Sequence, residues 1–248
     1  MEFLSTNIFI IFALILLCIS FLYASVGHGG ASGYLALMAL FSFPILVIKP
    51  TALLLNIFVS GISFWFFKKN KHFNWKLFYP FAITSIPAAF LGGYLTINTT
   101  LYKQILGVFL VIAVLRILGV FGKEQDHKKA VQVPLALVIG CGIGLFSGMI
   151  GIGGGIILSP IILLLAWGNT KESAAVSALF IFVNSIAGII GFLLKHNSFP
   201  TESFYLIPFA LIGGSMGAYF GSQKLSNVKL TYMLSFVLIL ASFKLFLY

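Results

Sequence analysis

The stretch from Phe146 to Trp167, FSGMIGIGGGIILSPIILLLAW, limits the possible fold more than any other part of the chain. It is apolar throughout, yet its centre, GIGGG, forms helix poorly because each glycine weakens a helix by about 1 kcal/mol relative to alanine. Pro160 follows and has no backbone donor. In a bilayer, unwound backbone is tolerated only where protein buries it or where it lines a watery cavity. The stretch therefore predicts a broken membrane helix whose free N–H and C=O groups face a solute.

The composition indicates an all-α polytopic membrane protein with a single transmembrane domain over residues 1–248. Hydrophobic residues make up 60% of the chain and charged residues 8%, whereas soluble domains carry roughly 25% charged residues. The net charge of +10 comes from lysines in short loops between apolar stretches, which is typical of topology determinants. The expected partner is the lipid bilayer and not nucleic acid. Cys18 and Cys141 lie in apolar stretches and are expected in the core, and neither a metal site nor a cofactor is expected.

Ten apolar stretches follow one another, and two of them are short. If the short ones fold back on their neighbours, the chain has about eight transmembrane helices. The stretches are Asn7–Val26, Ala31–Phe43, Pro50–Phe67, Leu77–Ile97, Leu101–Phe121, Val133–Ile150, Ile156–Trp167, Ala174–Leu194, Phe204–Ser222 and Lys229–Leu247.

The order of these stretches predicts two internal repeats, at about 7–121 and 133–248, joined by a polar linker at about 122–132. Three kinds of match support the duplication, and their order never changes. Gly27, Gly29 and Gly30 match Gly151, Gly153 and Gly154; Asn56 matches Asn184; and IPAAFLGG (Ile86–Gly93) matches IPFALIGG (Ile207–Gly214). A duplicated unit with a Gly-rich break in each copy indicates a secondary transporter whose site lies where the breaks meet, near the midplane.

The relative orientation of the two repeats stays open at this stage. Short segments that cross the membrane give each half an odd count and inverted repeats, whereas short segments that fold back give parallel repeats. The lysines in the loops fit both topologies about equally well.

Acidic residues are absent from the middle of every apolar stretch. Cation and proton carriers usually need such a carboxylate, so its absence favours an anion as the substrate. The N-termini of half-helices present free N–H groups and the positive end of the helix dipole, which suits an anion. The five acids, all in loops or at segment ends, are Glu2, Glu124, Asp126, Glu172 and Glu202.

The candidate substrate-binding residues lie in or beside the two breaks. His28 is the only histidine within the membrane-spanning pattern and suits either a proton-coupling role or direct donation to an anion, although a structural role in the loop is the alternative. Paired glycines elsewhere, such as Gly92 and Gly93, are expected to pack helices closely. The candidate set is Gly27, His28, Gly29, Gly30, Ser32, Asn56, Ser147, Gly151, Gly153, Gly154, Gly155 and Asn184.

One enzyme motif needs consideration. Gly30–Gly33 reads GASG, which resembles the GxSG nucleophile motif of rhomboid intramembrane proteases. Such a serine needs a histidine base from a later membrane helix. Every histidine after Ser32 lies in a loop, so no catalytic residue is assigned and the chain is not expected to be an enzyme.

With its paired glycine motifs the chain resembles the TauE/SafE family, also called the 4-toluene sulfonate uptake permease family. The second copy, GIGGGIILSP followed by AAVSALFIFVNSIAG, matches closely, whereas GHGGASGY in the first copy departs from the pattern. The resemblance implies a transporter of the cytoplasmic membrane for sulfite, sulfoacetate or other sulfonates. The paired breaks favour transport by alternating access. An anion channel and a non-transporting membrane scaffold or assembly factor are the alternatives. A coupling proton and a homo-oligomer are both compatible with the sequence.

Overall fold

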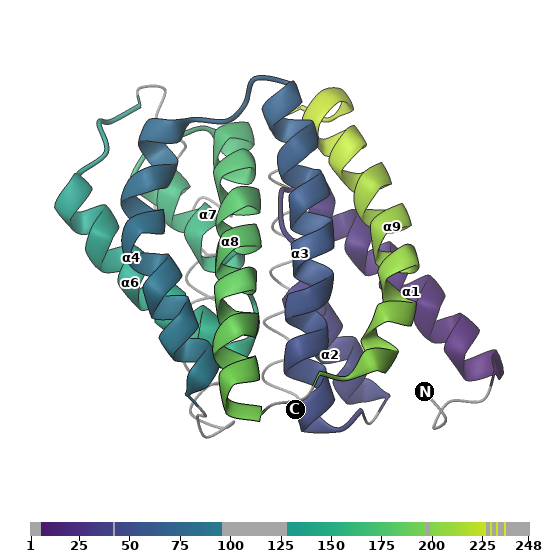
Figure 1. The fold of residues 1–248 in the computed structure, drawn as a ribbon. Helices are drawn as coiled ribbons and strands as arrows, with labels where there is room; N and C mark the ends of the chain where they lie inside the picture. Colours follow the sequence, from purple (N-terminus) through teal and green to yellow (C-terminus); the bar gives the residue numbers. More distant parts are fainter. Residues whose placement is uncertain are drawn as a thin grey trace.

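The computed structural model describes residues 6–41, 43–95, 128–196 and 199–226, together with residues 229, 232 and 236. Within these residues the protein is all-helical, without a strand (Figure 1). The elements are α1 (Thr6–Ser25), α2 (Ala31–Leu40), α3 (Ile45–Lys69), α4 (Trp75–Tyr94), α6 (Val133–Ile150), α7 (Gly155–Leu164), α8 (Thr170–His196), the 3₁₀ helix η1 (Thr201–Leu206), α9 (Ile207–Tyr219) and the π-helical turn η2 (Phe220–Lys224).

Six helical stretches in the described residues are long and apolar enough to cross a membrane, which confirms the prediction of a polytopic helical membrane protein. The stretch Val133–Ile150 coincides with α6, and α2 and α7 are the two short apolar helices. The predicted stretch Leu101–Phe121 lies outside the described residues, as does nearly all of Lys229–Leu247. The linker at 122–132 is described only from residue 128 onward.

Helix α3 begins earlier than the sequence indicated. The expected apolar stretch began at Pro50. The helix instead begins at Ile45, with Pro44 at the N-cap and Pro50 inside it. This correction brings Lys49 into a candidate membrane span.

Helices α3 and α8 pack side by side in the centre, and the contacts between them show that they run in opposite directions (Figure 1). As the residue number rises along α3, the number of its partner on α8 falls. The pairs are Leu53 with Gly188, Asn56 with Ser185, and Gly61 with Phe182.

The outer helices pack in two pairs, α1 with α9 and α4 with α6. In the predicted repeats α1 corresponds to α6, α3 to α8 and α4 to α9. Under this correspondence the pair α1–α9 becomes the pair α6–α4, and the pair α3–α8 corresponds to itself. If the halves are repeats, the antiparallel course of α3 and α8 makes them inverted. The internal duplication itself stays a prediction.

Glycine rows bring the outer pairs into close backbone contact. A Cβ atom at any of these glycines would overlap the backbone of the neighbouring helix. Small residues at four-residue spacing are the usual means of close packing between membrane helices. The α6 row is Gly140, Gly144 and Gly148 against α4, and the α9–η2 row is Gly213, Gly217 and Gly221 against α1. Gly92 and Gly93 also lie at helix contacts, as the sequence predicted.

Most described lysines gather at one end of the bundle, at the top of Figure 1. Polar contacts hold this end together: Nδ2 of Asn70 and Nζ of Lys171 both donate to Ser222, at 3.2 and 3.5 Å. The positive-inside rule predicts that this end faces the cytoplasm. The lysines concerned are Lys68, Lys69, Lys71, Lys76, Lys128, Lys129, Lys171 and Lys224.

Both cysteines are exposed on the outside of the bundle, so the expectation that they lie in the core was wrong. In a membrane helix the lipid-facing side is as apolar as the packed side. An apolar sequence context therefore does not separate buried from lipid-facing positions.

Candidate functional site

Both predicted helix breaks are present. The first separates α1 from α2, and the second separates α6 from α7. Positive φ angles, which L side chains rarely adopt, turn the chain at both places. They occur at Gly27 (76°), Gly30 (98°), Gly151 (90°), Gly153 (71°) and Gly154 (81°).

The two breaks meet against the middle of α8. A Cβ atom at Gly29 would lie 3.0 Å from Ile181 Cγ2, and one at Gly153 would lie 2.7 Å from the same atom. A side chain at Gly155 would overlap Ile181 as well. The structure thus brings together these three candidate residues from different halves of the chain. Gly27 packs nearer the start of α8, against the backbone of Ala174.

Asn56 of α3 sits between the breaks. Its Oδ1 accepts a hydrogen bond from Ala31 N at 3.1 Å and so caps the N-terminus of α2. Its Nδ2 donates to Ser185 Oγ at 3.4 Å and lies 3.0 Å from the Cβ position of Gly153. A Cβ atom at Gly29 would overlap its amide. One buried asparagine thereby touches both breaks.

Asn184 holds the matching place on α8 but has no such partner. It is fully buried, and neither Nδ2 nor Oδ1 makes a hydrogen bond to the described residues. Its i−4 and i+4 neighbours are Phe180, which contacts Gly154, and Gly188, which contacts Gly148. Asn184 therefore faces the break between α6 and α7.

The N-terminus of α7 is uncapped within the described part of the chain. Its N-cap residue, Gly154, supplies no side-chain hydrogen bond. Ser147 lies close by, with its Cβ 3.3 Å from the Cβ position of Gly154. Its hydroxyl donates to the carbonyl of Gly144 at 3.1 Å. This helix start presents free backbone donors and the positive end of the helix dipole.

His28 reaches from the first break to α7 and α8. Its Nε2 lies 2.9 Å from Ser159 Oγ, which in turn lies 2.8 Å from Ser177 Oγ. The other ring nitrogen, Nδ1, makes no well-aligned hydrogen bond to the described residues, although the backbone of Gly155 lies beside the ring. The imidazole is thus buried at the head of a chain of hydroxyl groups.

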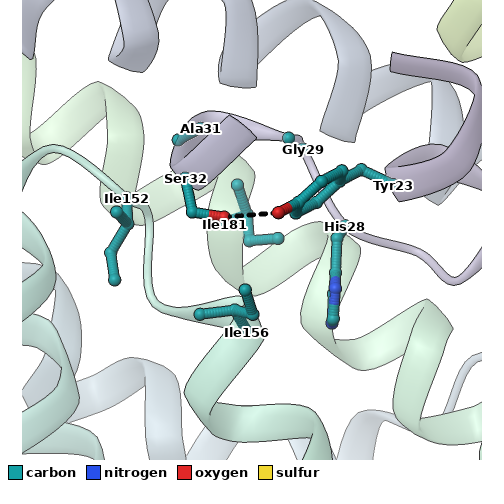
Figure 2. A pocket seen from close by; sticks show the side chains of 9 residues that line it. Tyr23, His28, Gly29, Ala31, Ser32, Ile152, Ile156 and Ile181 are labelled. Atoms are coloured by element: carbon teal, nitrogen blue, oxygen red, sulfur yellow. Dashed lines mark hydrogen bonds between the residues drawn. The ribbon is translucent and has the colours of Figure 1, made fainter. Parts of the chain in front are cut away.

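A small cavity lies between the breaks (Figure 2). It has room for about one water molecule. Tyr23 Oη and Ser32 Oγ, 2.8 Å apart, form its polar wall. The lining residues are Tyr23, His28, Gly29, Gly30, Ala31, Ser32, Ile152, Ile156 and Ile181. Ser32 is hydrogen bonded to Tyr23 and His28 to Ser159, so the pairing that the GASG motif would need is not among these contacts.

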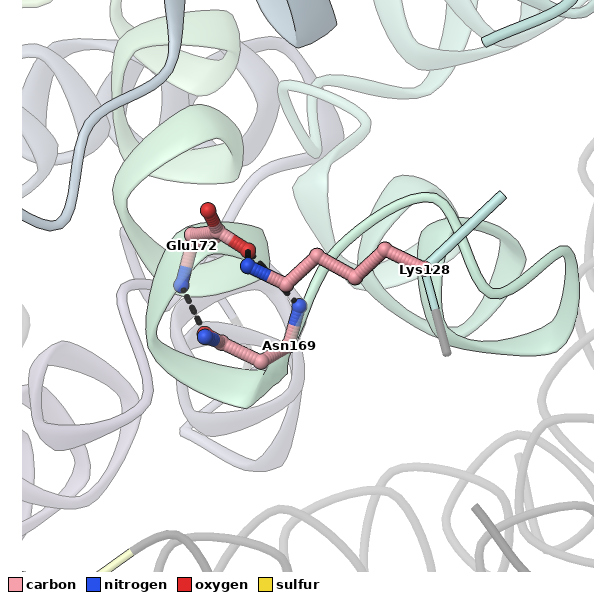
Figure 3. Close-up of polar contacts among 3 residues, drawn as sticks. All are labelled: Lys128, Asn169 and Glu172. Atoms are coloured by element: carbon pink, nitrogen blue, oxygen red, sulfur yellow. Dashed lines mark hydrogen bonds and ion pairs between the residues drawn. The ribbon is translucent and has the colours of Figure 1, made fainter. Parts of the chain in front are cut away.

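The one carboxylate whose side chain is described belongs to Glu172, at the start of α8 (Figure 3). Glu172 Oε2 accepts from Asn169 N at 3.0 Å, and Asn169 Oδ1 accepts from Glu172 N at 2.9 Å, which is a capping box. Lys128 Nζ pairs with the same oxygen at 2.7 Å. This acid closes a helix end, and no described carboxylate reaches the breaks.

Sequence reasoning missed Lys49 and Tyr23. Lys49 Cγ lies 3.0 Å from the Cβ position of Gly151, at the second break. It was overlooked because the apolar stretch was taken to begin at Pro50. Tyr23 is on α1, four residues before Gly27. It was overlooked because nothing in the sequence distinguishes it from the other aromatic residues of that helix.

The fold and the paired breaks define a multi-pass membrane protein of the transporter class. Comparison with known proteins narrows this further: the sequence profile of "Sulfite exporter TauE/SafE" matches residues 12–245. The chain belongs to the TauE/SafE family of membrane transporters.

Several curated relatives carry the same kind of name. A "probable membrane transporter protein", y4hK of Sinorhizobium fredii, is 38% identical over 235 residues, covering 92% of this chain and 94% of the relative. MJ0441 of Methanocaldococcus jannaschii is 28% identical, covering 76% and 74%, and YunE of Bacillus subtilis is 25% identical, covering 77% of each. No solved structure matches the chain.

Proposed function

We propose that this transporter carries a small anion, sulfite or an organic sulfonate, across the cytoplasmic membrane by alternating access at the two glycine breaks. The anion binds at the N-terminus of α7, where Asn184 and the free N–H groups of Gly155 and Ile156 donate to it. The sulfur chemistry of the substrate is supported by the family description. The site is supported by the contacts around α7.

One observation carries the site: the two half-helices start differently. Asn56 caps α2, whereas Asn184 in the matching place is buried without a hydrogen-bond partner among the described residues, one helical turn after Phe180, which meets Gly154 at the uncapped start of α7. An unsatisfied buried polar group costs about 1–3 kcal/mol, so its presence calls for a ligand or a second arrangement that satisfies it. An anion at α7 would accept from Asn184 Nδ2.

The electrostatics favour an anion over a cation. The breaks offer backbone N–H groups, hydroxyl groups and an amide, and the described carboxylate is engaged by Lys128 and Asn169 at the start of α8. Fixed donors at a helix N-terminus can replace the hydration shell of an anion. The positive end of the α7 dipole adds to the attraction.

The packing supports alternating access. Antiparallel α3 and α8, flanked by the pairs α1–α9 and α4–α6, are what inverted repeats would produce. In transporters of that kind one repeat moves against the other around a fixed site. The cavity between the breaks has room for only about one water molecule, so passage of a sulfonate requires such a movement.

The test is uptake of radiolabelled sulfite and of a sulfonate into proteoliposomes by the wild type, Gly154→Leu and Gly142→Leu. A side chain at Gly154 would meet Phe180 and Ile143 at a φ of 81°, whereas no atom of the described residues lies within 4 Å of the Cβ position of Gly142. We expect flux to fall at least about tenfold in Gly154→Leu and to persist in Gly142→Leu. Normal flux in folded Gly154→Leu would refute the site.

Counterflow separates the alternatives. A carrier that alternates access saturates and accumulates labelled substrate against unlabelled substrate on the other side, whereas a channel does neither. A scaffold or assembly factor shows no flux at all and tolerates leucine at Gly154. Proton coupling through His28 would appear as flux driven by an imposed pH gradient.

A further inference from the structure

Resting on the anion transport proposed above, we propose that Lys49 is the charge-selecting residue of the transport path. It attracts the anion from the end of the molecule opposite the lysine-rich end. The site at α7 then receives an anion that has already passed Lys49. Lys49 adds a positive charge to a site otherwise built from neutral donors.

The position of Lys49 places it on an approach to the breaks. It lies seven residues before Asn56 on α3, which is two helical turns or about 10 Å, so both residues share a face of the helix. Its Cγ lies 3.0 Å from the Cβ position of Gly151, the residue that ends α6. Lys49 therefore lies between one end of the bundle and the meeting point of the breaks.

The charge of Lys49 is not neutralised within the described residues. Its Nζ donates to the carbonyl oxygen of Gly93 at 3.2 Å and lies 5.8 Å from the centre of the Phe192 ring. Neither partner carries a formal charge, and Lys195 nearby adds a like charge. An ionisable residue within a membrane span is costly and commonly marks an ion path. An anion beside Lys49 would supply the missing opposite charge.

The approach from the other end has a different character. The position that matches Lys49 in the second half is Ser177, whose hydroxyl continues the chain from His28 through Ser159. That side lines the path with neutral hydrogen-bonding groups and carries its lysines beyond them at the end of the bundle, whereas on the other side Lys49 itself lies beside the second break. Next to the breaks, charge selection therefore acts on the Lys49 side.

A purely structural role for Lys49 predicts a different mutational pattern. The Gly93 carbonyl lies in the last turn of α4, where a lysine often donates to a free carbonyl. Glutamine at position 49 keeps a donor and loses the charge, whereas arginine keeps the charge. A structural role needs only the donor, so it would survive Lys49→Gln.

The experiment measures sulfite flux against substrate concentration in proteoliposomes, at several NaCl concentrations, for the wild type, Lys49→Gln and Lys49→Arg. Lys69→Gln is the matched control, because Lys69 is exposed at the opposite end over the Trp65 ring. We expect Lys49→Gln to raise the half-saturating concentration about tenfold and to lose most of its salt dependence, because screening acts on a charge it no longer has. Lys49→Arg and Lys69→Gln should stay close to the wild type.

Each other outcome counts against the proposal in a recognisable way. Unchanged half-saturation and salt dependence in folded Lys49→Gln overturn the role of Lys49 while leaving anion transport standing. Loss of flux in both Lys49 variants together with a lower unfolding temperature assigns the residue to the α4 terminus. Absence of anion flux in the wild type overturns the proposed function and this inference together.

Discussion

Asn56 Oδ1 accepts a hydrogen bond from Ala31 N at 3.1 Å and so occupies the start of α2 with the protein's own side chain. Asn184 stands in the matching place for α7 and leaves that helix start free. The first asparagine contributes to stability, because loss of an N-cap costs about 0.5–2 kcal/mol. The second should lower stability, and under the proposed function the bound anion supplies its missing partner. The two residues therefore respond in opposite ways to the same substitution.

Replacing Asn184 by leucine should preserve or raise stability while abolishing transport. The substitution removes a buried amide without partners, which is worth about 1–3 kcal/mol, and also removes the proposed donor to the anion. Asn56→Leu should instead lower the unfolding temperature, since α2 loses its cap and Ser185 its partner. Thermal unfolding in detergent and anion flux in proteoliposomes, measured on the same preparations, test both statements.

A drop in unfolding temperature in Asn184→Leu as large as that in Asn56→Leu would mean that Asn184 is a structural residue. Asn184→Ser, which is shorter but keeps a hydroxyl donor, should retain part of the flux. Its behaviour separates loss of the donor from loss of packing volume.

The close helix contacts make a prediction that does not depend on transport. Gly144→Ala should destabilise the protein by about 1–3 kcal/mol, because its Cβ would overlap the backbone of Ser85 on α4. Gly142→Ala, on the same helix with open space at its Cβ, should stabilise by up to about 1 kcal/mol through helix propensity. The measurement is the unfolding midpoint of both variants in one detergent, and equal shifts would contradict the close α4–α6 contact.

Much of this architecture could be predicted from the sequence, because a broken apolar helix has few alternatives in a bilayer. The apolar run fixed α6 at Val133–Ile150, and four glycines within five residues located the second break. The start of α3 was misjudged because Pro50 was treated as a boundary although the helix continues through it. Lys49 was missed with it.

The orientation of the halves could not be predicted, because it depends on whether the short helices return toward their own side. That is a question of packing, which appears only in contacts such as Asn56 with Ser185. That Asn56 has hydrogen-bond partners and Asn184 has none among the described residues was hidden for the same reason. Identical residue types at matching places gave the same sequence signal.

His28 should control how flux depends on pH. Its imidazole is buried at the head of the chain through Ser159 and Ser177, so a proton taken up there has hydroxyl groups along which to move. His28→Gln keeps a hydrogen-bonding group toward Ser159 but cannot titrate. We expect measurable flux with a flattened pH profile, recorded as initial rates of sulfite uptake at fixed gradient. An unchanged profile would remove His28 from proton coupling.

Stability should fall in mild acid through His72, in the loop at the lysine-rich end. Burial lowers the pKa of His72 below its ordinary value of 6.5, and Lys171 acts in the same direction, against the Ser222 carbonyl and Glu172, which raise it. The folded loop therefore prefers the neutral ring, whose Nε2–H donates to the Ser222 carbonyl at 3.1 Å. As the pH falls below about 6.5, the unfolded chain binds the proton more readily and the folded state loses stability, whereas above that value His72 contributes no pH dependence.

His72→Gln keeps a donor without titrating, so the unfolding temperature of the wild type relative to this variant should decline between about pH 6.5 and pH 5. Parallel curves for the two proteins would mean that His72 binds its proton equally well in both states.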